Sequence, residues 1–147
     1  MDSTRPELIN LTTIDHPSGT ITVAEEGTHS PFAFRRAYFL HGLNPSSQRG
    51  AHGHRKLRQL MIAISGSFRV RLSGSFGVES YELEDPNQGL LIPPMTWRDL
   101  DTFSPGAICL VLASDRYDEA DYIRDYEEFV KLMDPRNEGR TGFQKRE

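Results

Sequence analysis

The chain has 147 residues, of which 37% are hydrophobic and 26% are charged, with eight Phe, five Tyr and one Trp. That length fits a single domain, and that composition excludes a chain that is disordered throughout. The formal net charge of −4 argues against a nucleic-acid partner, since such proteins are usually basic.

Short β-strands separated by glycine, proline and polar turns are predicted along most of the chain. The strand candidates are residues 19–24, 32–40, 51–54, 59–66, 68–72, 79–83, 89–94, 96–103 and 107–113. Their spacing of about 8–12 residues is typical of a β-sandwich or barrel. We therefore expect one all-β domain whose barrel spans about residues 11–114.

One amphipathic helix is predicted after the last strand, at about residues 118–133. Apolar residues recur there at helical spacing, with acidic residues such as Asp121 between them. Asp118 is the expected N-cap, and Pro135 prevents continuation. The polar tail, residues 136–147, is expected to be poorly ordered.

The chain carries no pattern that indicates a membrane span or a secreted protein. Its apolar runs are much shorter than the about 20 residues that cross a bilayer, and its polar start lacks the pattern of a signal peptide. The single cysteine, Cys109, lies in an apolar run, where a buried, inert thiol is expected. We expect a cytoplasmic protein with no membrane partner.

The segment around His52 and His54 is the most informative part of the sequence. In an extended strand these two residues face the same side. The stretch from His52 through Gln59 to Gly66 resembles the first motif of the cupin barrel, with Gln59 where cupins carry a glutamate. The third histidine of cupins would fall near Arg98. A neutral amide is a weak metal ligand and a guanidinium cannot coordinate, so the sequence predicts no metal and no cofactor.

A histidine pair without a metal leaves two interpretations. Each histidine could simply be a partly buried, hydrogen-bonded side chain. Alternatively, the pair could perform acid–base chemistry next to a carbonyl group, because histidine titrates near neutral pH.

Longer stretches of the chain resemble one family, the cupin-fold sugar-nucleotide 3,4-ketoisomerases (WxcM- and FdtA-like) that act on dTDP-4-keto-6-deoxyglucose. The resemblance covers about residues 11–133, and the matching stretches are residues 36–39, 49–59, 66–70, 89–97 and 110–124. It implies a small cupin barrel, a homodimer without metal, and a dTDP-linked keto-deoxysugar as substrate. It also implies a role in deoxysugar biosynthesis, for glycans such as O-antigen or S-layer.

The resemblance and the chemistry together give a candidate site. The catalytic candidates are His52, His54 and Tyr38; the substrate-binding candidates are Arg36, Arg49, Gln59, Arg69, Trp97 and Arg98. One histidine would take the proton from C3, and the other, with Tyr38, would shuttle protons to the oxygens and C4. Arginines would hold the pyrophosphate and the enediolate. Trp97 would lie partly in the core and partly in the pocket wall, with stacking on a sugar or base as the alternative.

Several alternatives remain open at this stage. Arg98 could be a surface residue, and any of the other arginines a solvated side chain. A 3,5-epimerase would use the same substrate, but such enzymes are longer and pair their histidine base with an aspartate; the match at residues 49–59 favours the isomerase. A cupin that binds a sugar nucleotide without turnover and a metal-dependent dioxygenase are the other candidates.

Overall fold

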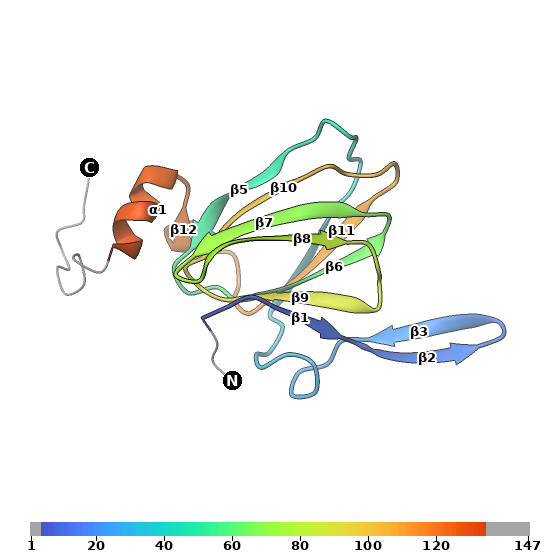
Figure 1. Ribbon diagram of the computed structural model, residues 1–147. Helices are drawn as coiled ribbons and strands as arrows, with labels where there is room; N and C mark the ends of the chain where they lie inside the picture. Colours follow the sequence, from blue (N-terminus) through green and yellow to red (C-terminus); the bar gives the residue numbers. More distant parts are fainter. Residues whose placement is uncertain (1–3, 135–147) are drawn as a thin grey trace.

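The computed structural model describes residues 4–134, which form two packed β-sheets, a projecting hairpin and one short helix (Figure 1). The strands are β1 (Glu7–Asn10), β2 (Thr12–His16), β3 (Gly19–Val23), β4 (Arg36–Leu40), β5 (Arg49–His54), β6 (Gln59–Ser65), β7 (Phe68–Gly74), β8 (Gly77–Leu83), β9 (Gln88–Ile92), β10 (Trp97–Asp101), β11 (Ile108–Ala113) and β12 (Tyr122–Ile123). A 3-10 helix, η1 (Glu119–Asp121), precedes β12, and α1 (Tyr126–Met133) ends the described fold. The all-β prediction is confirmed.

The two large sheets have five strands each and are antiparallel at every pairing. Their orders are β1-β9-β6-β11-β4 and β12-β5-β10-β7-β8. Alternate residues of β7, among them Phe68 and Val70, point between the sheets and join Met61, Val111 and Cys109 in the main core. Cys109 is fully buried, and burial raises the pKa of its thiol to about 12, as an inert thiol requires.

Strand β6 is covered on both faces. Met61 and Ala63 face the main core, whereas Leu60 and Ile62 face outward and are covered by Leu11 and by Phe32 and Phe34 of the segment before β4. This explains why β6 reads as a continuous apolar run rather than an alternating one. It also explains why the strand predicted for residues 32–40 is shorter in the structure: Phe32 and Phe34 pack over the sheet, and only β4 joins it.

The N-terminal part contains two strands that the sequence did not predict. β1 extends the first sheet by pairing with β9, so the barrel begins at Glu7 rather than near residue 11. β2 pairs only with β3, and Figure 1 shows this hairpin extending well beyond the sandwich. β1 and β2 are short and largely exposed, and neither alternates between apolar and polar residues, so hydrophobic periodicity could not reveal them.

The helix predicted for residues 118–133 is wrong in its first half. Asp118 caps only η1, and Tyr122 and Ile123 form β12, which pairs with β5. Helix α1 begins at Tyr126, with Asp125 as the N-cap that accepts a hydrogen bond from the Glu127 backbone. Pairing with β5 has overridden helical spacing. The tail at residues 136–147 lies outside the described residues. Within residues 4–134, no helix is long and apolar enough to span a bilayer.

A β-bulge sits in β5 directly before His52. The register between β10 and β5 shifts at this point, because Arg98 lies opposite His52 while Asp99 lies opposite Gly50. Gly50 and Ala51 both have left-handed backbone angles, with φ of 87° and 59°. A Cβ at Gly50 would lie 2.9 Å from the carbonyl oxygen of Arg98, so the position requires glycine both for its angle and for space.

We predict that Gly50→Ala lowers the free energy of unfolding by about 2–4 kcal/mol, from backbone strain plus the clash with β10. Gly27 is the matched control because it has the same φ of 87° but nothing within 4 Å of its Cβ position. Gly27→Ala should therefore cost only the strain, about 1–2 kcal/mol. Urea denaturation of the two variants measures the difference, and equal losses would show that the close approach to β10 contributes nothing.

Candidate active site

Two histidines of β5 point between the sheets at one end of the sandwich. His54 is 1% exposed and His52 is half-buried, and their rings meet edge to face with centroids 4.9 Å apart. The Nδ1 of His52 donates to the carbonyl of Gly50 at 3.1 Å. The prediction that the alternation of an extended strand brings these two rings together is confirmed.

Tyr122 of β12 packs against both histidine rings. Its ring centroid lies 5.0 Å from that of His52 and 4.4 Å from that of His54. The pairing of β12 with β5 sets this contact, because it places Tyr122 opposite His54. The segment that sequence analysis assigned to a helix therefore forms one wall of the site.

A buried hydrogen-bonded chain links the two sheets beside the histidines. Arg98 of β10 is 2% exposed, donates to the backbone carbonyl of Thr96 at 2.8 Å and donates to the side-chain oxygen of Gln59 on β6. Gln59 in turn donates from Nε2 to the hydroxyl of Tyr38 on β4 at 2.9 Å. A surface role for Arg98 is excluded, and Gln59 faces the site as the cupin-like spacing predicts.

Burial and the charge of Arg98 control protonation in the site. Burial lowers the pKa of Arg98 only to about 10, so the guanidinium stays charged at neutral pH. Burial and then the Arg98 charge lower the pKa of His52 to about 4 and that of His54 to about 2. Both imidazoles are therefore neutral, and Tyr38 keeps its proton because burial raises its pKa.

Four buried side-chain nitrogens in the part of the chain that the structure describes have no hydrogen-bond partner. They are Nε of Arg36, Nε of Arg98 and the Nε2 atoms of His52 and His54. All four belong to residues that the sequence assigns to one site. Buried polar atoms are normally paired, so this concentration marks the place where a polar ligand would bind.

Two other candidates, Arg36 and Arg49, belong to strands that border the site. Arg36 of β4 lies over the rings of Tyr38 and Tyr117, 5.1 and 5.7 Å from their centroids. Arg49 is exposed at the start of β5, on the chain that leads to His52.

Arg69 and Trp97 do not reach the histidines. Arg69 lies on the outer face of β7 and forms two 2.8 Å hydrogen bonds with Asp101. Trp97 lies on the outer face of β10, beneath Tyr126 and Phe129 of α1. The core part of the Trp97 prediction is therefore confirmed, whereas the alternative of stacking on a ligand has no geometric basis, because α1 covers the ring.

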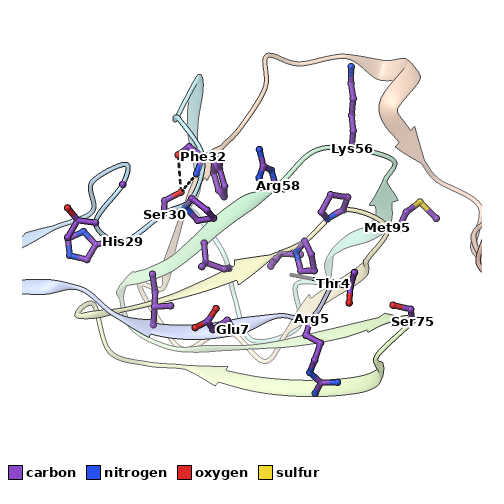
Figure 2. A pocket seen from close by; sticks show the side chains of 18 of the residues that line it. Thr4, Arg5, Glu7, His29, Ser30, Phe32, Lys56, Arg58, Ser75 and Met95 are labelled. Carbon is purple, nitrogen blue, oxygen red and sulfur yellow. Dashed lines mark hydrogen bonds between the residues drawn. The ribbon is translucent and has the colours of Figure 1, made fainter. Parts of the chain in front are cut away.

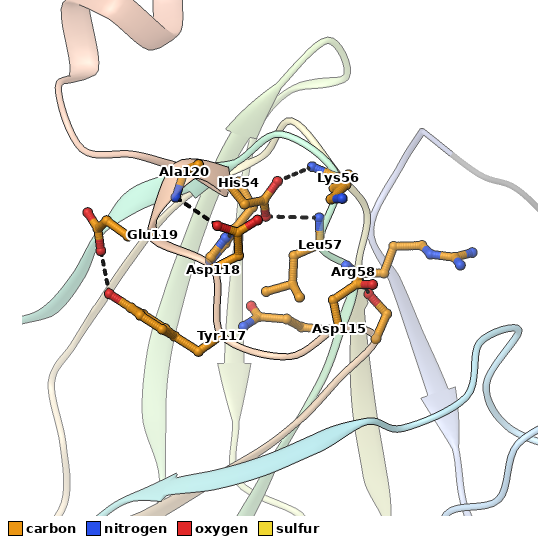
Figure 3. Close-up of polar contacts among 12 residues, drawn as sticks. His54, Lys56, Leu57, Arg58, Asp115, Tyr117, Asp118, Glu119 and Ala120 are labelled. Carbon is orange, nitrogen blue, oxygen red and sulfur yellow. Dashed lines mark hydrogen bonds and ion pairs between the residues drawn. The ribbon is translucent and has the colours of Figure 1, made fainter.

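Asp121 is a site residue that was not predicted, and its carboxylate lies 3.1 Å from Nδ1 of His54. Its carboxylate also accepts from the backbone nitrogens of Lys56 and Leu57, drawn as dashed lines in Figure 3. No pattern in the sequence indicates this contact, because an acidic residue suits the first turn of a helix equally well. An aspartate partner for a histidine thus does not distinguish the isomerase from the epimerase.

The groove in Figure 2, about 920 Å³, lies away from the histidines, on the outer face of the first sheet. It runs between Phe32 and Arg58 on one side and Arg5 and Glu7 on the other. We place the site at the histidine pair, because the unpartnered buried nitrogens lie there and not in the groove. Among residues 4–134 no group of three His, Cys, Asp or Glu side chains is arranged to hold a metal ion.

Comparisons with known proteins point to one family. The family model described as "WxcM-like, C-terminal" (FdtA) matches residues 4–134. A TDP-4-oxo-6-deoxy-alpha-D-glucose-3,4-oxoisomerase from Aneurinibacillus thermoaerophilus is 35% identical over 86% of this chain and 91% of its own length.

Solved structures agree with this relationship. A mutant 3,4-ketoisomerase from Thermoanaerobacterium thermosaccharolyticum, solved with TDP-4-keto-6-deoxyglucose, is 36% identical with a TM-score of 0.84, covering 87% of this chain and 93% of its own. A TDP-quinovose 3,4-ketoisomerase from Campylobacter jejuni is 38% identical with a TM-score of 0.83, covering 88% and 99%. A dTDP-4-dehydrorhamnose 3,5-epimerase from Bacillus anthracis is 14% identical with a TM-score of 0.69, covering 80% and 76%, and shares the fold alone.

The lowered pKa values of the two histidines predict that acid destabilises the protein. Between pH 6.5, the ordinary histidine value, and about pH 4, the unfolded chain binds protons that folded His52 and His54 do not. The free energy of unfolding therefore falls as pH falls, by up to about 1.4 kcal/mol per pH unit and histidine. Between pH 7 and 5, wild type should lose about 2–4 kcal/mol more than the double variant His52→Asn/His54→Asn in urea denaturation. Equal losses would contradict neutral histidines in the folded site.

Proposed function

The chain belongs to the WxcM-like, C-terminal (FdtA) family, and from this premise we propose that it is a sugar-nucleotide 3,4-ketoisomerase. It converts dTDP-4-keto-6-deoxy-D-glucose to the dTDP-3-keto-6-deoxyhexose, in deoxysugar biosynthesis. The observation that carries this function is the pair of buried, unpartnered Nε2 atoms of His52 and His54 in a fold shared with 3,4-ketoisomerases. The 14% identity to the epimerase supports no transfer of that activity.

The reaction moves one hydrogen between carbons and one between oxygens. The C4 carbonyl acidifies the C3 hydrogen, whose removal as a proton leaves an enediolate. A proton added at C4 then forms the new C–H bond, while the O3 hydroxyl loses its proton and O4 gains one, so that the ketone stands at C3. No electron acceptor is needed, because the oxidation of C3 balances the reduction of C4.

His52 is the proposed base at carbon. Its Nδ1–H is tied to the carbonyl of Gly50, so in the neutral ring Nε2 carries the free lone pair. It is also the less buried ring of the pair, nearer to where a sugar would enter. His54 and Tyr38, deeper in the site, would move protons between O3 and O4.

The buried arginines supply positive charge for the enediolate and the nucleotide. Arg98 is buried and has an unpartnered Nε, and a fixed charge in a buried position stabilises a developing oxyanion strongly. Arg36 has a buried, unpartnered Nε, and with exposed Arg49 it is suited to the pyrophosphate. Arg69 is not proposed for this role, because Asp101 already occupies its guanidinium.

We also propose that the enzyme needs no metal. A divalent cation at the histidines would meet Gln59, a weak neutral ligand, and the buried charge of Arg98, which repels it. The positive guanidinium performs the electrostatic task that a Lewis acid has in other barrels.

A homodimer is the proposed assembly. The hairpin β2–β3 projects from the sandwich with Ile14 and Ile21 opposite each other and 53% and 60% exposed (Figure 1). An isolated two-stranded hairpin is marginally stable in water, so its apolar face requires cover. A second copy of this chain would provide it.

Proton NMR of dTDP-4-keto-6-deoxyglucose in deuterated water, with a chelator present, tests the activity. We expect a 3-keto product with deuterium at C4. His52→Asn should lower kcat by at least about 1,000-fold and stop carbon exchange, because the base at carbon is lost. His54→Asn should slow product formation while C3 still exchanges, because His52 remains.

His41→Asn is the matched control, because His41 is an exposed loop histidine, and its activity should equal that of wild type. In wild type, deuterium at C3 or C5 without any 3-keto product would indicate an epimerase. Binding without exchange would indicate a binding module, and loss of activity with the chelator would contradict metal independence.

Light scattering tests the assembly. Wild type should have twice the mass of one chain, and Ile14→Asp/Ile21→Asp should shift the protein to the mass of one chain, because charges would replace the buried apolar pair. Val78→Asp is the control, since Val78 on β8 is 66% exposed but lies outside the hairpin. An unchanged mass in the hairpin variant would exclude this interface.

A further inference from the structure

The carboxylate of Asp121 is buried at the junction between the histidine strand and the turn that follows it. Asp121 is only 7% exposed. Its Oδ1 accepts from the backbone nitrogen of Lys56 at 2.8 Å, and its Oδ2 lies 3.3 Å from the backbone nitrogen of Leu57 and 3.1 Å from Nδ1 of His54. Dashed lines in Figure 3 mark the hydrogen bonds that the backbone nitrogens of Lys56 and Leu57 donate.

The two backbone donors determine which group is the donor in the contact between Asp121 and His54. A backbone N–H can only donate, so both carboxylate oxygens act as acceptors and the group is held as a carboxylate. The Nδ1 of His54 must then carry the hydrogen that fills the third contact. Because His54 is neutral, its Nε2 is left as a bare lone pair, buried and without a protein partner.

The contact is a hydrogen bond to a charged acceptor rather than an ion pair. Burial and the positive charge of Arg98 hold the pKa of His54 well below its usual value, so the ring does not become an imidazolium at neutral pH. The carboxylate therefore fixes the position of the ring hydrogen without charging the ring. A carboxylate behind a histidine orients the ring and raises the basicity of its far nitrogen.

The same aspartate also anchors the backbone around the histidine. Its own backbone carbonyl accepts from Arg55 at 2.9 Å, while the carbonyl of His54 accepts from the backbone nitrogen of Met95 at 2.8 Å. The far side of Asp121 lines a separate cavity of about 420 Å³ with Lys56 and Asp118, on the outside of the site. Asp121 thus lies between this outer cavity and His54.

We propose that Asp121 is a positioning residue that locks His54 in the tautomer with hydrogen on Nδ1, so that Nε2 faces the substrate as a proton acceptor. The expected effect on kcat rests on the proposed ketoisomerase activity. The tautomer of His54 does not depend on that activity. With His52 held the same way by Gly50, both rings present a bare Nε2 to the sugar. Neither ring is a proton donor until it has taken a proton from substrate, which leaves Tyr38 as the resting donor.

Nitrogen-15 NMR of the histidine rings, combined with kinetics, tests this role. In wild type at pH 7, His54 should show a protonated Nδ1 and an unprotonated Nε2. In Asp121→Asn the amide nitrogen faces His54 as a donor, so the ring should invert to Nε2–H. We expect kcat to fall by at least about 100-fold, with KM changed by less than about threefold, because the substrate contacts remain.

Two further variants separate positioning from folding. Asp118→Asn is the matched control, because Asp118 lines the same outer cavity, caps η1 and does not contact His54; it should keep both the tautomer and kcat. Asp121→Glu keeps an acceptor-only carboxylate and should keep the Nδ1–H tautomer and recover part of kcat.

The test does not depend on the folding of a variant, because the NMR spectrum of wild type alone shows which ring nitrogen of His54 carries the hydrogen. Hydrogen on Nε2 of wild-type His54, or an Asp121→Asn variant that retains the Nδ1–H tautomer and full kcat, would overturn the role of Asp121. A wild-type protein without turnover overturns the proposed function instead, and the NMR reading then decides the role of Asp121 independently.

Discussion

The buried charge of Arg98 is the constraint on which the site depends. A buried guanidinium is stable only when polar groups accept its hydrogen bonds. Here the acceptors are the backbone carbonyl of Thr96, just before β10, and the side chain of Gln59 on the opposite sheet. This arrangement orients Gln59 toward Tyr38 and joins the sheets at the site. The same charge, added to burial, keeps both histidines neutral, so the interaction that holds the site together also prepares its bases.

The sequence predicted those parts of the site that depend on local geometry. The two-residue period of a strand brings His52 and His54 together, and the spacing to Gln59 places it on β6, the next strand along the chain, in the opposite sheet. The strand at residues 68–72 was also predicted and forms part of β7. Its sequence could not show that Asp101 on β10 occupies the guanidinium of Arg69.

The parts that escaped prediction depend on contacts between distant segments. Tyr122 and Ile123 have helical spacing to Phe129, yet β5 offers them a strand partner, and tertiary pairing outweighs local preference. Asp121 acquires its role only because η1 brings it to the turn after His54. Trp97 has an aromatic ring that could stack on a ligand, but α1 covers it. The position of α1 cannot be predicted from the sequence of β10.

The crystal structure of His52→Asn with dTDP-4-keto-6-deoxyglucose tests the central claim most directly, that the sugar reacts between His52 and His54. The account predicts C3 within about 3–3.5 Å of the side chain at position 52, with the sugar oxygens near His54 and Tyr38 and the pyrophosphate on Arg36 or Arg49. A sugar bound in the outer groove beside Phe32 and Arg58, or one whose C3 faces away from β5, would contradict it.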